Sequence, residues 1–446
     1  MTDDQNSARN PRVIPRSEHR ISRANISDNA LKVLYRLHNA GYEAYLVGGG
    51  VRDLSLGREP KDFDVATDAR PEAVKELFRN CRLIGRRFRL AHVHFGPEII
   101  EVATFRALDD PNSESNGDRV IEDGLIVRDN VYGTLAEDAL RRDFTINSLY
   151  YNIADFSVVD HAGGMEDLQA GVVRLIGDPE VRYREDPVRM LRAIRFAVKL
   201  GFKIHPDTAR PIGPMAELLR NIPAARLFEE SLKLFMAGTA LESFEALRKY
   251  GLFGELFPGV EQALARDTGG TGVRFISLAL KNTDQRVAEG KPVTPTFLFA
   301  ALLWPAVRDA MQGYLEQDMN EMAALQAAAQ DAIHDQLQRV GIPKRFSIPI
   351  RELWMLQPRL ERKGGRRSLR LLGHPRFRAA YDFMLLRAEV GEVDPEVAAW
   401  WRDFQAGSDE ERQTMTVDDA PRRKRRRRRR KPPAAAASPT PSAPSE

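Results

Sequence analysis

Residues 45–64, YLVGGGVRDLSLGREPKDFD, contain the features that decide the fold. The run at 42–47 predicts a short buried strand, the glycines at 48–50 end it, and residues 51–56 predict a short helix that stops at Gly57. A glycine turn that leads from a strand into a helix leaves backbone N–H groups available for phosphate oxygens. Arg52 on the first turn can add a guanidinium. Gly48, Gly49 and Arg52 are therefore candidate phosphate-binding residues.

Asp62 and Asp64 form an acidic pair just after this turn. On a strand, residues two apart point to the same side, so both carboxylates should face one way while Phe63 and Val65 face the core. Two neighbouring carboxylates repel each other unless a cation lies between them, and a hard divalent ion is the usual choice. Together with the glycine turn, the pair indicates metal-assisted phosphoryl or nucleotidyl transfer. The alternative is a tight turn followed by an edge strand with a solvated face.

Further polar residues follow in the same α/β segment. Glu101 alternates with apolar neighbours on a predicted strand at 99–105 and is a candidate third carboxylate, or else a solvent-facing residue. Residues 107–130 predict a mobile surface loop. A helix with a capping box is expected from Thr134. It would carry Arg141, Arg142, Asp143 and Asn147, with Asp143 and Asn147 on one face, and a chance stripe of salt bridges is the alternative. His92 and His94 are expected to be packing histidines.

Residues 182–202, RYREDPVRMLRAIRFAVKLGF, predict a helix that ends at Gly201. Asp186 is the expected N-cap, with Pro187 at the first helical position. Arg189, Arg192 and Arg195 form a basic row beside the apolar stripe. Asp186 and Arg189 can present an acceptor and donors to the planar edge of a nucleobase, whereas an ordinary solvated helix face is the alternative.

Composition limits the class of protein. The chain has 446 residues, enough for two or three domains, and its single cysteine, Cys81, excludes a disulfide framework and fits a cytoplasmic location. No apolar run approaches membrane-spanning length, so no membrane insertion is expected. The net charge is +4, yet ten positive charges lie in residues 422–431, so the rest of the chain carries −6. The RNA-binding candidates in this run are Arg422, Arg423, Lys424, Arg425, Arg426, Arg427, Arg428, Arg429, Arg430 and Lys431.

The order of five motifs resembles the class II polymerase-beta-type nucleotidyltransferases, the family of bacterial poly(A) polymerases and tRNA CCA-adding enzymes. The motifs are LVGGGVRD with DFD, EVATFR, RRDFTINSLYY, a GG–EDL turn and REDPVRMLRAIRF, and they span roughly residues 27–270. The resemblance implies an α+β fold, with a small mixed-sheet head followed by an all-helical neck and body. The expected parts are a disordered arm (1–26), a catalytic head (27–173), a neck (174–270), a body that binds RNA (271–412) and a disordered Arg-rich tail (413–446).

The resemblance also implies roles for the matching residues. Asp62 and Asp64 would hold two Mg²⁺ ions (Mn²⁺ is an alternative), with Glu101 or Asp143 as a further acidic partner. The triphosphate would lie on Gly48, Gly49, Arg52 and Arg142, and the sugar near Asp143. Asp186 and Arg189, backed by Arg192, would pair with the base.

The two branches of the family differ in substrate. The segment LIGRRFRL at 83–90, the motif FEESLKLFMAG at 228–238 and the Arg-rich tail resemble the poly(A) branch. The expected activity is template-independent addition of AMP from ATP to RNA 3′ ends, and RNA-decay or RNA-chaperone proteins are expected partners. A CCA-adding enzyme and a non-catalytic RNA-binding protein are the alternatives. The segment KGGRRSLR at 363–370 could touch a phosphate backbone.

Overall fold

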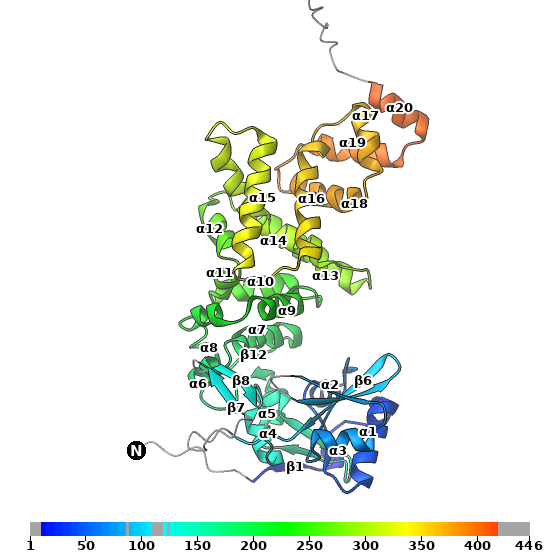
Figure 1. Ribbon diagram of the computed structural model, residues 1–446, viewed down its shortest axis with the longest axis vertical. Helices are drawn as coiled ribbons and strands as arrows, with labels where there is room; N and C mark the ends of the chain where they lie inside the picture. The colour runs from blue at the N-terminus through cyan, green and yellow to red at the C-terminus, as the bar shows by residue number, and fades with distance from the viewer. Residues whose placement is uncertain (1–9, 86–88, 109–118, 123–124, 130, 418–446) are drawn as a thin grey trace, which may run out of the picture.

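The computed structural model describes residues 10–85, 89–108, 119–122, 125–129 and 131–417. A mixed sheet with covering helices forms the head, and the described chain beyond it is helical apart from a two-residue strand at 203–204. The molecule is elongated, with the head at one end and α17 to α20 at the other (Figure 1). The predicted α+β architecture, with a sheet-containing head and a helical neck and body, is confirmed.

The head is built on an eight-stranded sheet with the strand order β1-β10-β9-β2-β3-β6-β5-β4. Strands β3 and β6 pair in parallel, and the other neighbours are antiparallel. The strands are β1 Arg12–Ile14, β2 Ala44–Val47, β3 Asp64–Thr67, β4 Cys81–Ile84, β5 Leu90–Phe95, β6 Glu98–Thr104, β9 Leu149–Asn152 and β10 Val158–Asp160. Separate small sheets are formed by β7 Arg119–Glu122 with β8 Leu125–Asp129, and by β11 Val172–Val173 with β12 Lys203–Ile204.

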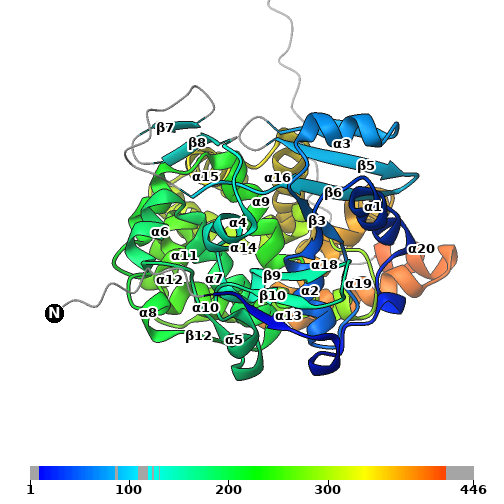
Figure 2. The same cartoon turned by 90° about the horizontal axis from the view of Figure 1, so that it is seen from below.

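Alternation along the strands produces two buried faces. One face contains Leu46, Val65 and Val102 and is covered by α1 Asp28–Asn39 and α3 Pro71–Leu77, which lie beside β3, β5 and β6 (Figure 2). The opposite face contains Val47, Ala66 and Tyr150 and packs against α4 Leu135–Arg141. Asp64 alternates with Val65 and therefore lies on the α4 side of the sheet. The head also contains η1 Arg16–Glu18, η2 Arg23–Asn25, α2 Gly49–Ser55, η3 Thr145–Asn147 and α5 Gly164–Ala170.

We call the remaining helices a neck and then a body, the division expected from the sequence. The neck contains α6 Pro179–Glu185, α7 Val188–Leu200, α8 Pro206–Ala209, η4 Ala216–Asn221, α9 Ala224–Phe235, α10 Ala240–Lys249, α11 Leu252–Leu256 and α12 Pro258–Arg266. The body contains α13 Thr271–Ala288, α14 Pro295–Leu315, α15 Glu321–Leu337, α16 Lys344–Leu360, α17 Gly365–Leu372, α18 Phe377–Glu389, α19 Pro395–Ala406 and α20 Asp409–Val417.

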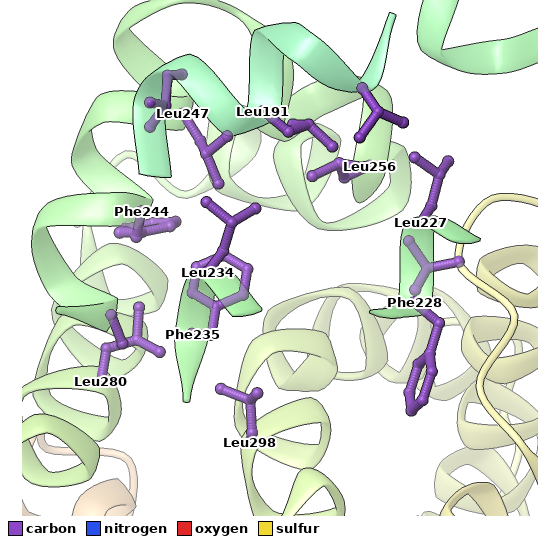
Figure 3. Close-up of a cluster of buried hydrophobic side chains, with 14 of the residues drawn as sticks. Leu191, Leu227, Phe228, Leu234, Phe235, Phe244, Leu247, Leu256, Leu280 and Leu298 are labelled. Carbon is purple, nitrogen blue, oxygen red and sulfur yellow. The ribbon is translucent and has the colours of Figure 1, made fainter. Parts of the chain in front are cut away.

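Neck and body share a continuous apolar core. Helix α9 contributes Leu227, Phe228 and Leu234 to this core. The core also contains side chains of α7 and α10 of the neck and of α14 of the body (Figure 3). The Phe228 ring stacks on Phe299 of α14, with the ring centroids 5.4 Å apart. Because this core is uninterrupted, α9 fixes the body to the part of the neck that packs against the head.

Three expectations about disorder and loops need correction. Residues 10–26 were expected to be disordered, but β1 pairs with β10, and Ile14, Ile21 and Ile26 are buried in the core. The expected loop at 107–130 contains the β7–β8 hairpin. The tail was expected to begin at 413, but α20 continues to Val417. The basic run at 422–431 lies outside the described residues. Among the residues described, none of the helices is both long and apolar enough to cross a bilayer.

Candidate nucleotidyl-transfer site

The glycine turn faces both a carboxylate and a guanidinium. Gly48 has φ 71° and ψ −134°, a conformation open to glycine, and α2 begins directly after it at Gly49. A Cβ atom on Gly48 would lie 3.6 Å from Nη1 of Arg142 and 3.9 Å from Oδ2 of Asp64. An acidic and a basic side chain that are 78 residues apart in sequence are thus brought to the same turn, where the helix N-terminus adds backbone N–H groups.

Asp64 belongs to a row of titratable groups across the sheet. It lies opposite Glu101 on the parallel strand β6, and His92 of β5 lies opposite Glu101 on the other side. The Nε2 atom of His92 is 3.3 Å from Oε2 of Glu101, so His92 is part of this row and does more than pack. Burial and the negative charges of Glu101 and Asp62 raise the pKa of Asp64 to about 6, although Arg142 and His92 act in the opposite direction.

Asp62 precedes the strand, because β3 begins at Asp64. The expectation that both carboxylates belong to one strand was therefore wrong, yet the charge of Asp62 still acts on Asp64. In the described part of the chain, no group of three or more His, Cys, Asp or Glu side chains is arranged to hold a metal ion. Mg²⁺ typically takes one or two carboxylates and completes its shell with water and phosphate oxygens. The pKa of Asp64 is raised by burial first and by the nearby negative charges second, and a bound cation would offset both effects.

Arg142 is held by two residues that the sequence did not single out. Its Nε donates to the Tyr150 hydroxyl at 2.7 Å, and its Nη2 donates to Asp138 Oδ2 at 3.2 Å. Tyr150 also donates to Asp138, at 2.6 Å. Burial lowers the pKa of Arg142, but Tyr150 and Asp138 outweigh burial and raise it above its ordinary value. Asp138 could have been noticed, because it stands four residues before Arg142 on the helix whose predicted capping box of Thr134 and Glu137 is confirmed.

Arg52 lies in a different environment from the one predicted. It is buried, its Nε donates to Asp53 Oδ1 at 2.8 Å, and its Nη1 donates to Asn147 Oδ1 at 2.7 Å. Its guanidinium also lies over the Phe196 ring of α7, 5.2 Å from the centroid. In this structure Arg52 therefore connects the glycine helix to η3 and to the neck, rather than being open to a phosphate.

Asp143 and Asn147 do not share a helix as predicted. Helix α4 ends at Arg141, and Arg142 has the extended backbone angles φ −61° and ψ 165°. Asn147 lies on η3 and still donates to Asp143 Oδ1, at 3.2 Å. Arg192 donates through Nε to Asp143 Oδ2 at 2.7 Å. Burial raises the pKa of Asp143, but Arg192 and Asn147 outweigh burial and hold it below its ordinary value. The Asp143 carboxylate is therefore charged and engaged by the neck.

The candidate base-reading residues lie where α6 meets α7. Helix α7 begins at Val188, so Asp186 follows the end of α6 and does not cap α7 with its side chain, as had been expected. Arg226 of α9 donates to Asp186 Oδ2 at 2.7 Å, whereas Asp186 Oδ1 is buried and has no hydrogen-bond partner among the described residues. Arg189 donates through Nη1 to Glu185 Oε2 at 2.8 Å. Arg226 was missed because its partner is 40 residues away.

Comparisons with known families match three segments of the chain. Residues 44–174 match the "Poly A polymerase head domain", residues 201–264 the "Probable RNA and SrmB- binding site of polymerase A" and residues 317–433 the "Polymerase A arginine-rich C-terminus". The three segments follow the order of the predicted head, neck and tail-bearing body.

Similar proteins indicate the same family. Poly(A) polymerase I of Salmonella typhi is 53% identical over 419 residues, which cover 92% of this chain and 89% of the relative. The CCA-adding enzyme of Bacillus pumilus is 37% identical over 240 residues, 54% of this chain and 57% of the relative. A solved "tRNA-processing enzyme (apo form 2)" shares the fold, with a TM-score of 0.57 and 22% identity over 86% of this chain and 99% of that one. CCA-adding enzymes are thus the more distant relatives, and the chain belongs to the bacterial poly(A) polymerase family of nucleotidyltransferases.

Proposed function

We propose that the site around Asp64 and Arg142 transfers AMP from ATP to RNA 3′ ends without a template and releases pyrophosphate. The single observation that carries this proposal is the geometry at Gly48, where Asp64 Oδ2 and Nη1 of Arg142 approach the same point of the glycine turn. A triphosphate needs cations and N–H donors, and the acidic side chain beside them suits a divalent ion that bridges protein and phosphate.

The family implies a divalent-metal requirement, and we propose Mg²⁺ as the ion. Asp62 and Asp64 would hold it, with Glu101 as the further carboxylate, because Glu101 lies opposite Asp64 and acts on its pKa. Asp143 is instead held by Arg192. When bound, two Mg²⁺ ions would lower the pKa of the RNA 3′-hydroxyl and neutralise charge on the triphosphate.

The protein's own groups position the nucleotide. Arg142, with Asp138 and Tyr150 behind it, stabilises the charge that builds on the phosphates, and the N–H groups after Gly48 orient them. Asp143 stays ionised toward the sugar. Arg52 contributes by holding the glycine helix against Asn147.

Adenine selection would use Asp186 and Arg189. Adenine offers an amino donor and a ring-nitrogen acceptor on one edge. The buried Oδ1 of Asp186 has no partner within the described chain and can accept from the amino group. Arg189 can donate to the ring nitrogen. A base that leaves the buried Oδ1 of Asp186 unpaired is disfavoured.

The test is a primer-extension gel with a labelled RNA, each nucleoside triphosphate separately, and Mg²⁺ or a chelator. A long ladder with ATP and Mg²⁺, absent for Asp62→Asn and Asp64→Asn, is the expected result. A short product that requires CTP would indicate CCA addition, and retained ladders in both variants would reject the metal assignment. Cytoplasmic location, RNA-decay or RNA-chaperone partners and the domain limits at 27–173, 174–270 and 271–412 stand as proposals beside this one.

A further inference from the structure

Exposed basic side chains recur along α16, the connection at 361–364 and α17. Residues 344–372 contain nine basic and two acidic residues, a net charge of +7. All nine basic side chains are exposed. We call them the α16–α17 stripe: Lys344, Arg345, Arg351, Arg359, Arg362, Lys363, Arg366, Arg367 and Arg370.

Most of this charge is not neutralised within the protein. Arg362 pairs with Glu321 and Lys363 with Glu396. The two acidic residues of the segment are bound to arginines outside the stripe, Glu352 to Arg376 and Glu361 to Arg387. For the other stripe residues, the described chain places no carboxylate oxygen within 4.0 Å.

Helix α17 keeps an unfavourable arrangement of like charges. Arg366 and Arg370 are four residues apart on α17, and such a pair of like charges destabilises a helix by a few tenths of a kcal/mol. The helix is held instead by its other side, where Ser368 and Leu371 are buried. A polyanion bound along the exposed side would remove this repulsion.

The stripe also stands out against the charge of the whole chain. The net charge of +4 becomes −6 without the ten charges of residues 422–431, and −13 when the +7 of residues 344–372 is also removed. Basic charge is therefore concentrated in this stripe and in the tail, on an otherwise acidic protein. Local basic surface of this kind binds nucleic acid by releasing counterions from phosphates.

The stripe begins beside the neck helix α9 and ends beside α20. Just before α16, the Gly341 N–H donates to the carbonyl of Ala224 at 2.9 Å, at the start of α9. Two residues further on, Arg226 holds the candidate base-reading residue Asp186. At the other end α17 packs against α20, the last described helix before the arginine run. Figure 1 shows α16 leading from the neck to α17, at the end of the molecule opposite the head.

We propose that the α16–α17 stripe binds the sugar-phosphate backbone of RNA upstream of the 3′ end and leads it from the neck toward the tail. This inference rests on the proposed function, because it assumes that the 3′ end lies in the head. At 1.5 Å per residue, α16 is roughly 25 Å long and α17 adds a second segment of roughly 12 Å. RNA too short to leave the head and neck cannot use the stripe, so its contribution depends on RNA length.

The experiment uses the full chain with two triple variants. Arg366, Arg367 and Arg370 are changed to Gln on α17, and Lys344, Arg351 and Arg359 are changed to Gln on α16, since Gln removes charge and keeps helix propensity. The matched control removes three exposed charges from α13, in the variant Arg274→Gln, Lys281→Gln, Arg286→Gln.

Binding of oligo(A) RNA of about 5 and about 30 nucleotides is measured as a function of salt. For the long RNA, each triple variant is expected to reduce the slope of log K against log salt by about 2, at about 0.7 per lost contact. In both stripe variants, affinity for the short RNA and AMP incorporation into it should match the wild type. The α13 control should match the wild type in all these measurements, including the salt slope for the long RNA.

Unchanged long-RNA slopes in the two stripe variants would overturn the proposal. A change in the α17 variant alone would refute a continuous path, and a lowered melting temperature with unchanged affinity would assign the arginines a structural role. Failure of the proposed function is a separate result. In that case wild-type protein would incorporate no AMP into either RNA, while the binding slopes would remain measurable.

Discussion

Replacing Asp64 with Asn should stabilise the metal-free protein above pH 6 while it abolishes AMP transfer. The Asp64 carboxylate is partly buried beside Glu101 and Asp62, and its pKa is raised to about 6 from an ordinary value of 3.8. Its ionised form is therefore disfavoured in the folded state relative to the unfolded state. Asn has nearly the same shape and carries no charge, so the variant removes the free-energy cost of holding an ionised carboxylate at this position.

The size of the gain follows from the shift. A rise of roughly two pKa units corresponds to about 3 kcal/mol of unfolding free energy, and partial exposure of Asp64 to solvent reduces the expected gain to about 1–2 kcal/mol. The sign depends on pH. Below about pH 3.8 both states are protonated and the difference is absent; it grows as the pH rises, and it is complete above about pH 6.

Urea denaturation followed by circular dichroism, with a chelator present, measures the difference in unfolding free energy between Asp64→Asn and the wild type at about pH 8 and about pH 4. Asp335→Asn, an exposed residue of α15, is the control for the loss of one charge and should be neutral at both pH values. Added Mg²⁺ should stabilise the wild type and reduce the advantage of Asp64→Asn. No gain at pH 8, or an equal gain at both pH values, would refute the argument that burial and nearby negative charge disfavour the ionised Asp64 carboxylate.

Three further predictions concern the base pocket, the support of Arg142 and the tail. Arg189→Ala should reduce the preference for ATP over CTP by roughly tenfold or more, with little change in RNA affinity; an unchanged ratio in competition assays would contradict its role at the base edge. Asp138→Ala leaves Arg142 and Tyr150 without their shared carboxylate, so it should cost about 3 kcal/mol in thermal denaturation and lower kcat; an unchanged Tm would show that the network is dispensable. Deletion of residues 418–446, which spares α20, should reduce the salt slope of RNA binding by up to about 7 and leave AMP incorporation into a short primer intact; an unchanged slope would leave the tail without this role.

Local signals in the sequence predicted the elements near the site well. The glycines at 48–50 mark the start of α2, the capping box marks α4, and Gly201 ends α7 in the left-handed conformation. Predicted helix boundaries were wrong where the apolar spacing continued past the end of the helix. The apolar spacing around Phe144 suggested a longer helix than α4, because periodicity alone does not show where a backbone leaves helical angles.

The sequence by itself determined the family, the order of head, neck and body, and the residue types of the site, because motifs and periodicity are properties of neighbours along the chain. Only the tertiary structure decided which of these residues meet. The parallel register of β3 and β6 places Glu101 beside Asp64, and packing turns Arg142 toward Gly48 and buries Arg52 against Asn147. Strand register and side-chain packing join residues that are 37 to 95 positions apart. No local sequence pattern links residues that far apart. The pairing of Asp64 with Glu101 and the partners of Arg52 and Arg142 therefore became visible only in the folded chain.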